Sequence, residues 1–121
     1  MVGLNRFWIQ TGGGGTKELL WRWTQAQEAK KDPDFAPQKV FDIIGYGKTA
    51  SSPIEAIPFK FLLEKDKNII NRNKLLSVSQ NLINEKKDGY KPPKKPIFKL
   101  SGGQVRDKMF QTLENLFKEK K

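Results

Sequence analysis

The spacing of apolar residues along the chain predicts mostly helices. Apolar positions that recur three and four residues apart mark one buried face of a helix. The first two predicted helices span 17–31, with the apolar face Leu19, Leu20, Trp23, Ala26 and Ala29, and 37–46, with the face Val40, Phe41, Ile43 and Ile44. Two more span 71–87, with the face Leu75, Leu76, Val78, Leu82 and Ile83, and 103–118, with the face Val105, Met109, Leu113, Leu116 and Phe117.

Residues that favour caps and turns separate these helices. Pro33 disfavours helical backbone at Asp32 and so ends the first helix. Gly45 and Gly47 are expected to end the second helix. Ser52 then serves as the N-cap of a short helix, with Pro53 at its first position and Glu55 completing a capping box, until Pro58 stops it. Asn71 is expected to cap the helix over 71–87, which Asp88 and Gly89 close.

Two short apolar segments are predicted to be extended: 7–10 as a short strand, and 59–63 as a strand or an extended piece. Neither has an obvious partner strand in the chain, and a lone strand leaves its backbone groups unpaired. The predicted fold class is therefore mainly α with one or two short strands. We expect a single domain over 1–121. It has an aberrant or strand-like N-terminus over 1–10, a helical part over 11–88, a Lys/Pro linker over 89–101 and a C-terminal helix over 102–121.

Two tryptophans lie in the first predicted helix. Trp21 and Trp23 are two positions apart, and residues at that separation do not share one face of a helix. One of them is therefore expected to cover a second surface.

The chain is strongly basic, with a formal net charge of +10 over 121 residues. Such a charge suits nucleic acid, an anionic membrane surface or phosphorylated small molecules, but solvated lysines produce the same balance. The lysines of the segment 86–99 accompany only Tyr90 and Phe98 as rings for stacking on bases, so we interpret this segment as a solvated linker. Because no apolar run has the length of a membrane span and the N-terminus lacks the order of a signal peptide, we expect a cytoplasmic protein.

The residue types that most often perform chemistry are missing. The chain has neither Cys nor His, which excludes a thiol nucleophile, a Cys-ligated zinc and the commonest general base. The carboxylate pairs lie in polar, Lys-rich surroundings that do not raise a pKa, so we interpret them as surface charge: Asp32/Asp34, Glu64/Asp66 and Glu114/Glu119. We therefore predict no catalytic residue and no metal site.

Four consecutive glycines, Gly12 to Gly15, lead into the first predicted helix. Glycine lets the backbone approach a ligand or another segment closely, and the start of a helix presents free N–H groups to an anion. A nucleotide P-loop is excluded, because Gly15-Thr16-Lys17-Glu18 lacks the required Gly-Lys-Ser/Thr ending. The run is either a tight passage from strand to helix or a ligand-binding loop.

Several segments, taken in order, resemble one known family. They are GGGGTKEL over 12–19, DP at 32–33, PQKVF over 37–41, KTASSPIEA over 48–56, NRNKLL over 71–76 and GYKPP over 89–93. Over about residues 11 to 100, this series resembles the C-terminal part of a crotonase-fold module, the enoyl-CoA hydratase/isomerase part of bacterial multifunctional 3-hydroxyacyl-CoA dehydrogenases of fatty-acid β-oxidation.

The resemblance implies acyl-CoA chemistry in the family. Such modules polarise a thioester carbonyl with two backbone N–H groups and move protons with two glutamates, all of which precede the glycine run. Here no acidic residue precedes Glu18, and Thr11 stands where the family has Pro. The resemblance thus implies a fragment that is inactive alone, with Gly12, Gly13 and Gly14 near an acyl-CoA and the N–H of Gly12 helping to position water. It implies no cofactor in the fragment, with NAD bound in a separate domain of the family.

Crotonase-fold proteins often pack their C-terminal helices on a neighbouring subunit. The resemblance, together with the apolar faces of the last two predicted helices, leads us to expect self-association and weak binding of a CoA ester. We expect neither a membrane nor a nucleic-acid partner. Two alternatives stay open: a small basic helical protein that binds nucleic acid or acts as a scaffold, and the product of a non-functional reading frame that folds only as an oligomer.

Overall fold

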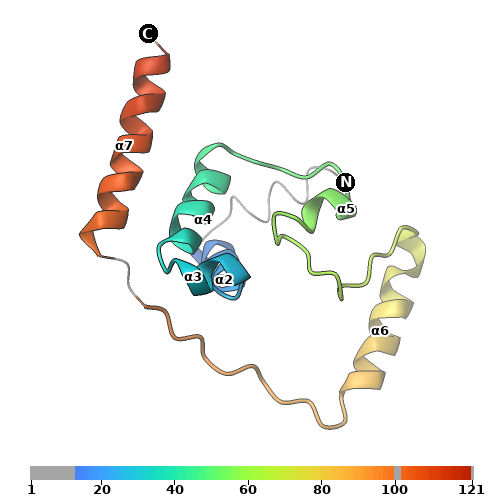
Figure 1. The fold of residues 1–121 in the computed structure, drawn as a ribbon. Coiled ribbons are helices and arrows are strands. Elements are labelled where there is room, and N and C mark those ends of the chain that lie inside the picture. The colour runs from blue at the N-terminus through green and yellow to red at the C-terminus, as the bar shows by residue number, and fades with distance from the viewer. Residues whose placement is uncertain (1–12, 100–101, 121) are drawn as a thin grey trace. The chain divides into compact units, whose positions relative to one another are not determined.

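The computed structural model describes residues 13–99 and 102–120 of the chain, and the predicted strand over 7–10 lies outside these ranges. All regular secondary structure in the described ranges is helical (Figure 1). The elements are α2 (Gly13–Thr24), α3 (Gln27–Lys31), α4 (Phe35–Gly45), α5 (Pro53–Ala56), the 3₁₀ turn η1 (Arg72–Lys74), α6 (Leu75–Lys86) and α7 (Gly103–Glu119). They belong to two compact units: unit 1 comprises 1–63 and 98–121, and unit 2 comprises Glu64–Ile97.

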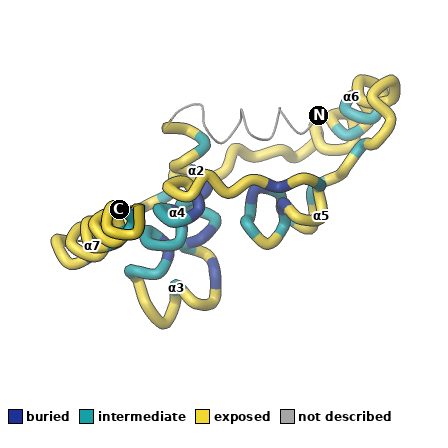
Figure 2. Tube along the Cα trace, turned by 90° about the horizontal axis from the view of Figure 1, so that it is seen from above, coloured by how far each residue is buried: buried dark blue, intermediate teal, exposed yellow. Residues whose placement is uncertain are grey.

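The hydrophobic core of unit 1 forms where α2 meets α4 and where α5 and the turn after it close over them. Buried positions gather in these parts of the chain (Figure 2). Leu19, Trp23 and Ala26 are buried as predicted, and so are Val40 and Ile43. The predicted face of α4 is wrong at Ile44, which is exposed. The remaining members of the core cluster are Ala36, Ala50, Ala56 and Phe61.

The helix predicted over 17–31 is two helices. It begins earlier, at Gly13, and α2 ends at Thr24, after which α3 starts at Gln27. The hydroxyl of Thr24 donates to the carbonyl oxygen of Trp21 at 2.6 Å, and such a bond back to the preceding turn competes with continuation of the helix. Ala26 then adopts extended backbone and its side chain enters the core, so the break serves packing.

Both ends of α4 follow from local backbone chemistry. At its start, the carboxylate of Asp32 accepts a hydrogen bond from the backbone N–H of Asp34 at 3.0 Å, which confirms the predicted break. At its end, Gly47 has φ of 60°, and the N–H of Lys48 donates to the carbonyl oxygen of Ile43 at 2.9 Å. This is the Schellman termination, in which a left-handed glycine turns the chain away from the helix axis.

The short helix α5 confirms the predicted cap. The hydroxyl of Ser52 accepts from the backbone N–H of Glu55 at 3.2 Å. The Glu55 carboxylate reaches back one residue further than in a standard capping box, since it accepts from the backbone N–H of Ser51 at 3.0 Å and also from the Ser51 hydroxyl. The start of α5 is therefore held by two side chains.

The prediction of a strand or an extended piece over 59–63 is wrong, because this segment consists of turns and bends. The N–H of Phe61 donates to the carbonyl oxygen of Ala56 at 3.1 Å. The carbonyl oxygens of the segment accept from side chains of α2: Trp23 Nε1 donates to Phe59 at 3.2 Å, and Arg22 Nη1 donates to Lys60 at 2.9 Å and to Phe61 at 2.8 Å. Side-chain donors from α2 thus replace the partner strand that the sequence lacks.

The last helix, α7, packs on α4 through the start of its apolar face. Val105 is buried and Met109 is half-buried, whereas Phe110 is 58% exposed and Phe117 is 70% exposed. Before α7, the ring of Phe98 meets the ring of Trp21 edge-on, with centroids 5.7 Å apart. The expectation for the two tryptophans is confirmed, since Trp23 enters the core and Trp21 covers a second surface.

Unit 2 contains η1, α6 and an irregular segment over 87–97. The side chain of Asn71 accepts from the backbone N–H of Asn73 at 3.0 Å, so Asn71 caps the element as predicted, with a 3₁₀ first turn. The predicted buried face of α6 is wrong, because no residue of this helix is buried. Leu76 is 71% exposed and Ile83 is 65% exposed.

Candidate functional site

The described part of the glycine run lies in the first turn of α2. Gly13 and Gly14 are helical and exposed, and a Cβ atom built on either would meet nothing within 4 Å. The described residues therefore make no close backbone approach at these two positions. Gly12 lies outside the described residues, so the placing of Gly12, Gly13 and Gly14 near an acyl-CoA stays a prediction.

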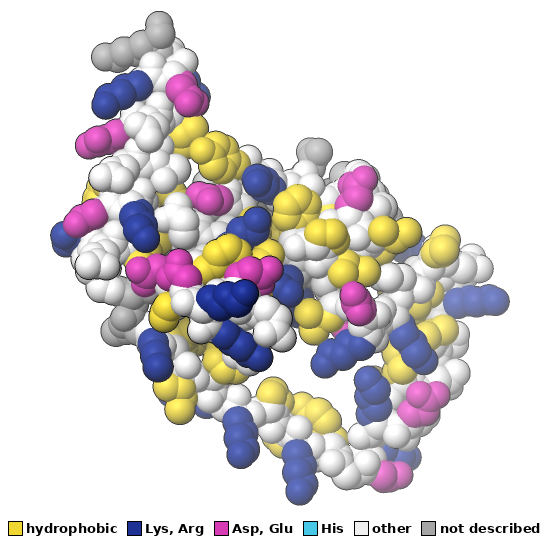
Figure 3. All heavy atoms as spheres, viewed as in Figure 1, with side chains coloured by type: hydrophobic (Ala, Val, Ile, Leu, Met, Phe, Trp, Pro, Cys, Tyr) yellow, Lys and Arg dark blue, Asp and Glu magenta, His cyan; other side chains and the backbone are white. Residues whose placement is uncertain are grey.

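A shallow apolar groove lies between α4 and α7, and we call it the α4–α7 groove. It has a volume of about 370 Å³ and is lined by Pro37 and Phe41 of α4, Arg106 and four apolar side chains of α7, Val105, Met109, Phe110 and Leu113, with Gly102 at its end. Apolar side chains show along the side of α7 that faces α4 (Figure 3). The guanidinium of Arg106 is the charged group that lines the groove. Among the described residues, no carboxylate lines it.

A second apolar hollow continues this surface toward α2. Its volume is about 390 Å³, and it shares Pro37, Phe41 and Met109 with the α4–α7 groove. The side chains it adds come from α2 and α4: Thr16, Leu20, Val40 and Ile44. Together the two hollows form a surface that fits an apolar chain and supplies no group for proton transfer.

Two lysines converge on the core tryptophan. The Nζ atom of Lys39 lies 5.3 Å from the centroid of the Trp23 ring, and that of Lys60 lies 5.1 Å from it. Trp23 itself is 7% exposed, and the two lysine side chains are among the groups that cover its ring. Within residues 13–99 and 102–120, neither ammonium group has an ion pair with a carboxylate. We call these three residues the Trp23 lysine pair site.

The backbone of Lys60 is unusual. Its φ is 61°, and it is the non-glycine residue with a positive φ in the described ranges. This left-handed backbone is held from both sides, because the N–H of Lys60 donates to the carbonyl oxygen of Ile57 at 2.9 Å and its own carbonyl oxygen accepts from Arg22. A strained residue that persists does so because its surroundings fix it.

The carboxylates serve as caps and ion-pair partners. Glu18 accepts from Nε of Arg22 at 3.3 Å, one helical turn away. Hydrogen bonds from the hydroxyl and then the backbone N–H of Ser51 hold the pKa of Glu55 below its ordinary value of 4.5, so it is an ionised capping group. In the described residues, no three side chains of the metal-binding types are grouped, and no helix is long and apolar enough to cross a membrane.

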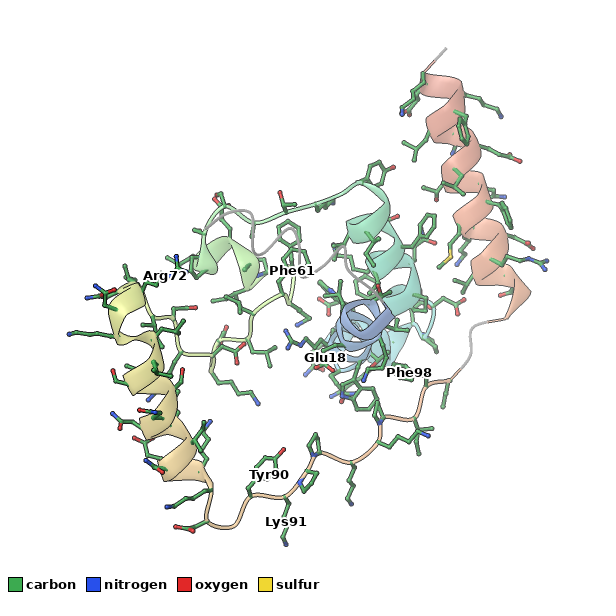
Figure 4. All side chains as sticks on the ribbon, turned by 180° about the vertical axis from the view of Figure 1, so that it is seen from behind. Glu18, Phe61, Arg72, Tyr90, Lys91 and Phe98 are labelled. Carbon is green, nitrogen blue, oxygen red and sulfur yellow. The ribbon has the colours of Figure 1, made fainter. Side chains whose placement is uncertain are left out.

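Of the two rings that the sequence placed in the Lys/Pro linker for stacking on bases, Tyr90 and Phe98, only Tyr90 is left without a ring partner in the described residues. The ring of Phe98 packs on that of Trp21, whereas Tyr90 is 66% exposed on a segment without helix or strand (Figure 4).

The sequence did not predict the Trp23 lysine pair site. Lys39 and Lys60 belong to separate segments that only the fold brings to one ring, so no local pattern marks them.

The chain is similar to a described protein over most of its length. It is 34% identical over 92 residues, or 75% of the chain, to a probable 3-hydroxyacyl-CoA dehydrogenase of Bacillus subtilis (strain 168). The match spans 11% of that protein. No family model and no solved structure matches the chain. The chain is therefore a distant homologue of a probable 3-hydroxyacyl-CoA dehydrogenase, with a match to about a ninth of that protein's length.

Proposed function

We propose that the chain is a segment of an acyl-CoA-metabolising enzyme of fatty-acid β-oxidation and corresponds to the C-terminal part of its crotonase-fold, enoyl-CoA hydratase module. One observation carries the proposal: the 34% identity over 92 residues to a probable 3-hydroxyacyl-CoA dehydrogenase. The ordered segments from the glycine run to GYKPP support the finer assignment to the crotonase-fold part.

The apolar surface along α4 supports a binding role rather than a proton-transfer role. The α4–α7 groove and the hollow beside it present Phe41, Met109 and other apolar side chains, which suit an acyl or pantetheine chain. Acid–base catalysis needs a carboxylate or a similar group within hydrogen-bond reach of the reacting atoms. Because none lines this surface in the described residues, we propose that the segment does not hydrate enoyl-CoA alone. Weak binding of a CoA ester is the other part of the proposed role.

Calorimetric titration with CoA esters of increasing acyl length tests this role. If the acyl chain enters the apolar surface, affinity rises from acetyl-CoA to decanoyl-CoA, with each buried methylene contributing up to about 0.8 kcal/mol. Phe41→Ser should remove this dependence, whereas Tyr46→Ser, an exposed change at the end of the same helix, should leave it unchanged. Equal affinity across the series, or equal loss in both variants, would contradict the proposal.

A hydration assay tests the proposed inactivity. Purified chain mixed with crotonyl-CoA should leave the absorbance of the conjugated thioester unchanged. Turnover that survives a second, orthogonal purification would overturn the proposal that the segment is inactive by itself. The same assay repeated with an added complementary segment of such an enzyme would report activity only when the missing acids are supplied.

Self-association is the second part of the proposal. On α7, Phe110 and Phe117 are both largely exposed, although Phe110 also lines the α4–α7 groove. Exposed apolar stripes of this kind mark surfaces that bind another protein surface. We propose that copies of the chain associate through this stripe, and the measurement is given with the predictions below.

A further inference from the structure

The positive charge of the chain is concentrated in unit 2. Residues 64–97 contain nine Lys or Arg and four Asp or Glu, so they carry +5 of the net charge of +10. The charge is densest over 86–95, which we call the basic segment and which contains a single acidic residue, Asp88. Its five lysines are Lys86, Lys87, Lys91, Lys94 and Lys95. Lysines clustered in this way give the electrostatic footprint of a surface that binds a polyanion.

The lysines of the basic segment are accessible to a ligand. Every residue from 86 to 95 is exposed. Among the described residues, none of the five lysines forms an ion pair with a carboxylate. An incoming anion therefore meets their full charge and has no ion pair to displace.

The prolines keep the second half of the basic segment extended. Residues 90–97 have neither helix, strand nor turn. Pro92 and Pro93 each fix their own φ near about −65°, and the residue before a proline is kept out of helical backbone. In the polyproline geometry that such residues favour, three residues make one turn, so Lys91 and Lys94 lie on one side, about 9 Å apart. The backbone thus holds the charges in an open row, which a flexible chain of phosphates can follow.

Tyr90 adds a stacking surface to this row of charges. Its ring is 66% exposed and has no ring partner among the described residues. The side chains of Tyr90 and Lys91 both project from the extended chain (Figure 4). Proteins that bind single strands without sequence preference combine positive charge along the backbone path with aromatic rings on which bases stack. Binding to a bilayer surface relies instead on an apolar face, which the basic segment lacks.

We propose that the basic segment binds single-stranded nucleic acid, with its lysines contacting phosphates and the ring of Tyr90 stacking on a base. The proposal departs from the expectation of a solvated linker without a nucleic-acid partner. The site is separate from the α4–α7 groove and does not depend on the proposed acyl-CoA function.

The first experiment measures the salt dependence of binding. The full chain is titrated into a fluorescently labelled oligouridylate of about 15 nucleotides, with fluorescence anisotropy as the signal. If all five lysines contact phosphates, the logarithm of the association constant falls with the logarithm of salt concentration with a slope of about −3.5. The double change Lys94→Gln and Lys95→Gln should make this slope shallower by about 1.4. Lys30→Gln and Lys31→Gln, at adjacent exposed positions of α3, remove the same charge and should leave the slope unchanged.

The second experiment separates nucleic acid from other polyanions. Tyr90→Ala should weaken binding of the oligouridylate by about fivefold or more, because a stacked base is lost. The same change should leave binding of inorganic polyphosphate, which has no bases, unchanged. Tyr46→Ala is the matched control, since the Tyr46 ring is 52% exposed and has Nζ of Lys48 6.0 Å from its centroid. This control should bind both polyanions like the parent chain.

Each outcome decides the proposal. A salt slope near zero, or equal changes in the two lysine double variants, would overturn the site. A Tyr90→Ala variant that binds the oligouridylate as the parent does, or that loses polyphosphate binding equally, would reduce the interaction to general charge attraction and overturn the assignment to nucleic acid. Binding to phosphatidylglycerol vesicles without binding to the oligouridylate would assign the segment to a membrane surface and also overturn it.

Discussion

Nη1 of Arg22 donates a 2.8 Å hydrogen bond to the carbonyl oxygen of Phe61, and the same atom donates to the preceding carbonyl at 2.9 Å. Phe61 is 6% exposed and belongs to the core cluster, so its backbone lies where water has little access. A backbone acceptor in such a place needs a partner, and here a side chain from α2 provides it. The relationship ties the turn after α5 to the first helix of the core.

Replacement of this guanidinium should therefore destabilise unit 1. Arg22→Met keeps most of the side-chain volume and leaves two carbonyl oxygens without their donor, which costs about 1–3 kcal/mol in the free energy of unfolding. Urea denaturation, monitored by tryptophan fluorescence, measures this loss in the free energy of unfolding. Arg72→Met, at an exposed position of η1, is the control and should change stability by less than about 0.5 kcal/mol (Figure 4). Similar losses in both variants would contradict the role of Arg22.

The left-handed backbone of Lys60 leads to a comparison of two small side chains. Lys60→Gly and Lys60→Ala both remove the ammonium group from Trp23, but only glycine adopts a φ of 61° without strain. We expect the glycine variant to be more stable than the alanine variant by about 1 kcal/mol. Thermal unfolding of the two proteins side by side measures this difference, and equal melting temperatures would show that the position carries no backbone strain.

The cap of α5 should make stability depend on pH through Glu55. Hydrogen bonds from Ser51 lower the pKa of this carboxyl group in the folded chain. A group with a lowered pKa contributes stability above its unfolded pKa, and that contribution is lost as the pH falls through its folded pKa. Glu55→Gln should therefore melt at a lower temperature than the parent chain at neutral pH and converge with it in acid. A constant difference across the pH range would exclude ionisation of Glu55 as the cause.

The exposed stripe of α7 predicts association that increases with concentration. Sedimentation velocity should show larger species as concentration rises, and added salt should favour them because it screens the repulsion between chains of net charge +10. Phe117→Glu should weaken association by about tenfold or more, since it places a charge among buried aromatic contacts. Ile54→Glu, at an exposed position of α5, is the matched control. A monomer at every concentration, or equal weakening by both changes, would overturn the proposed interface.

The sequence predicted those parts of the fold that depend on local patterns. The caps at Ser52 and Asn71, the break at Asp32 and the faces containing Leu19, Trp23, Val40 and Ile43 are all present. The wrong predictions, for segment 59–63 and for the face of α6, share one cause. Each depends on whether residues distant in the sequence contact the segment. Segment 59–63 has the composition of a strand, but Arg22 and Trp23 bind its carbonyl oxygens in a turn.

The face of α6 has helical periodicity, but no described segment packs closely enough on it to bury a residue of this helix. The same reasoning explains why the sequence pointed to one of the candidate sites and not to the other. The glycine run was expected to precede a helix over 17–31, but α2 already begins at Gly13, so Gly13 and Gly14 belong to its first turn. The Trp23 lysine pair site depends on two segments meeting at one ring, so no local pattern could have predicted it.

The contact of Phe98 with Trp21 has a topological consequence. Phe61, three residues before unit 2 begins, is bound by Arg22, and Phe98, immediately after unit 2 ends, meets Trp21. The chain thus departs from unit 1 and rejoins it at adjacent positions of a single helix. Glu64–Ile97 is in this sense an insertion: the contacts of Phe61 and Phe98 with α2 close a loop over it, and a shorter loop would lower the entropic cost of that closure.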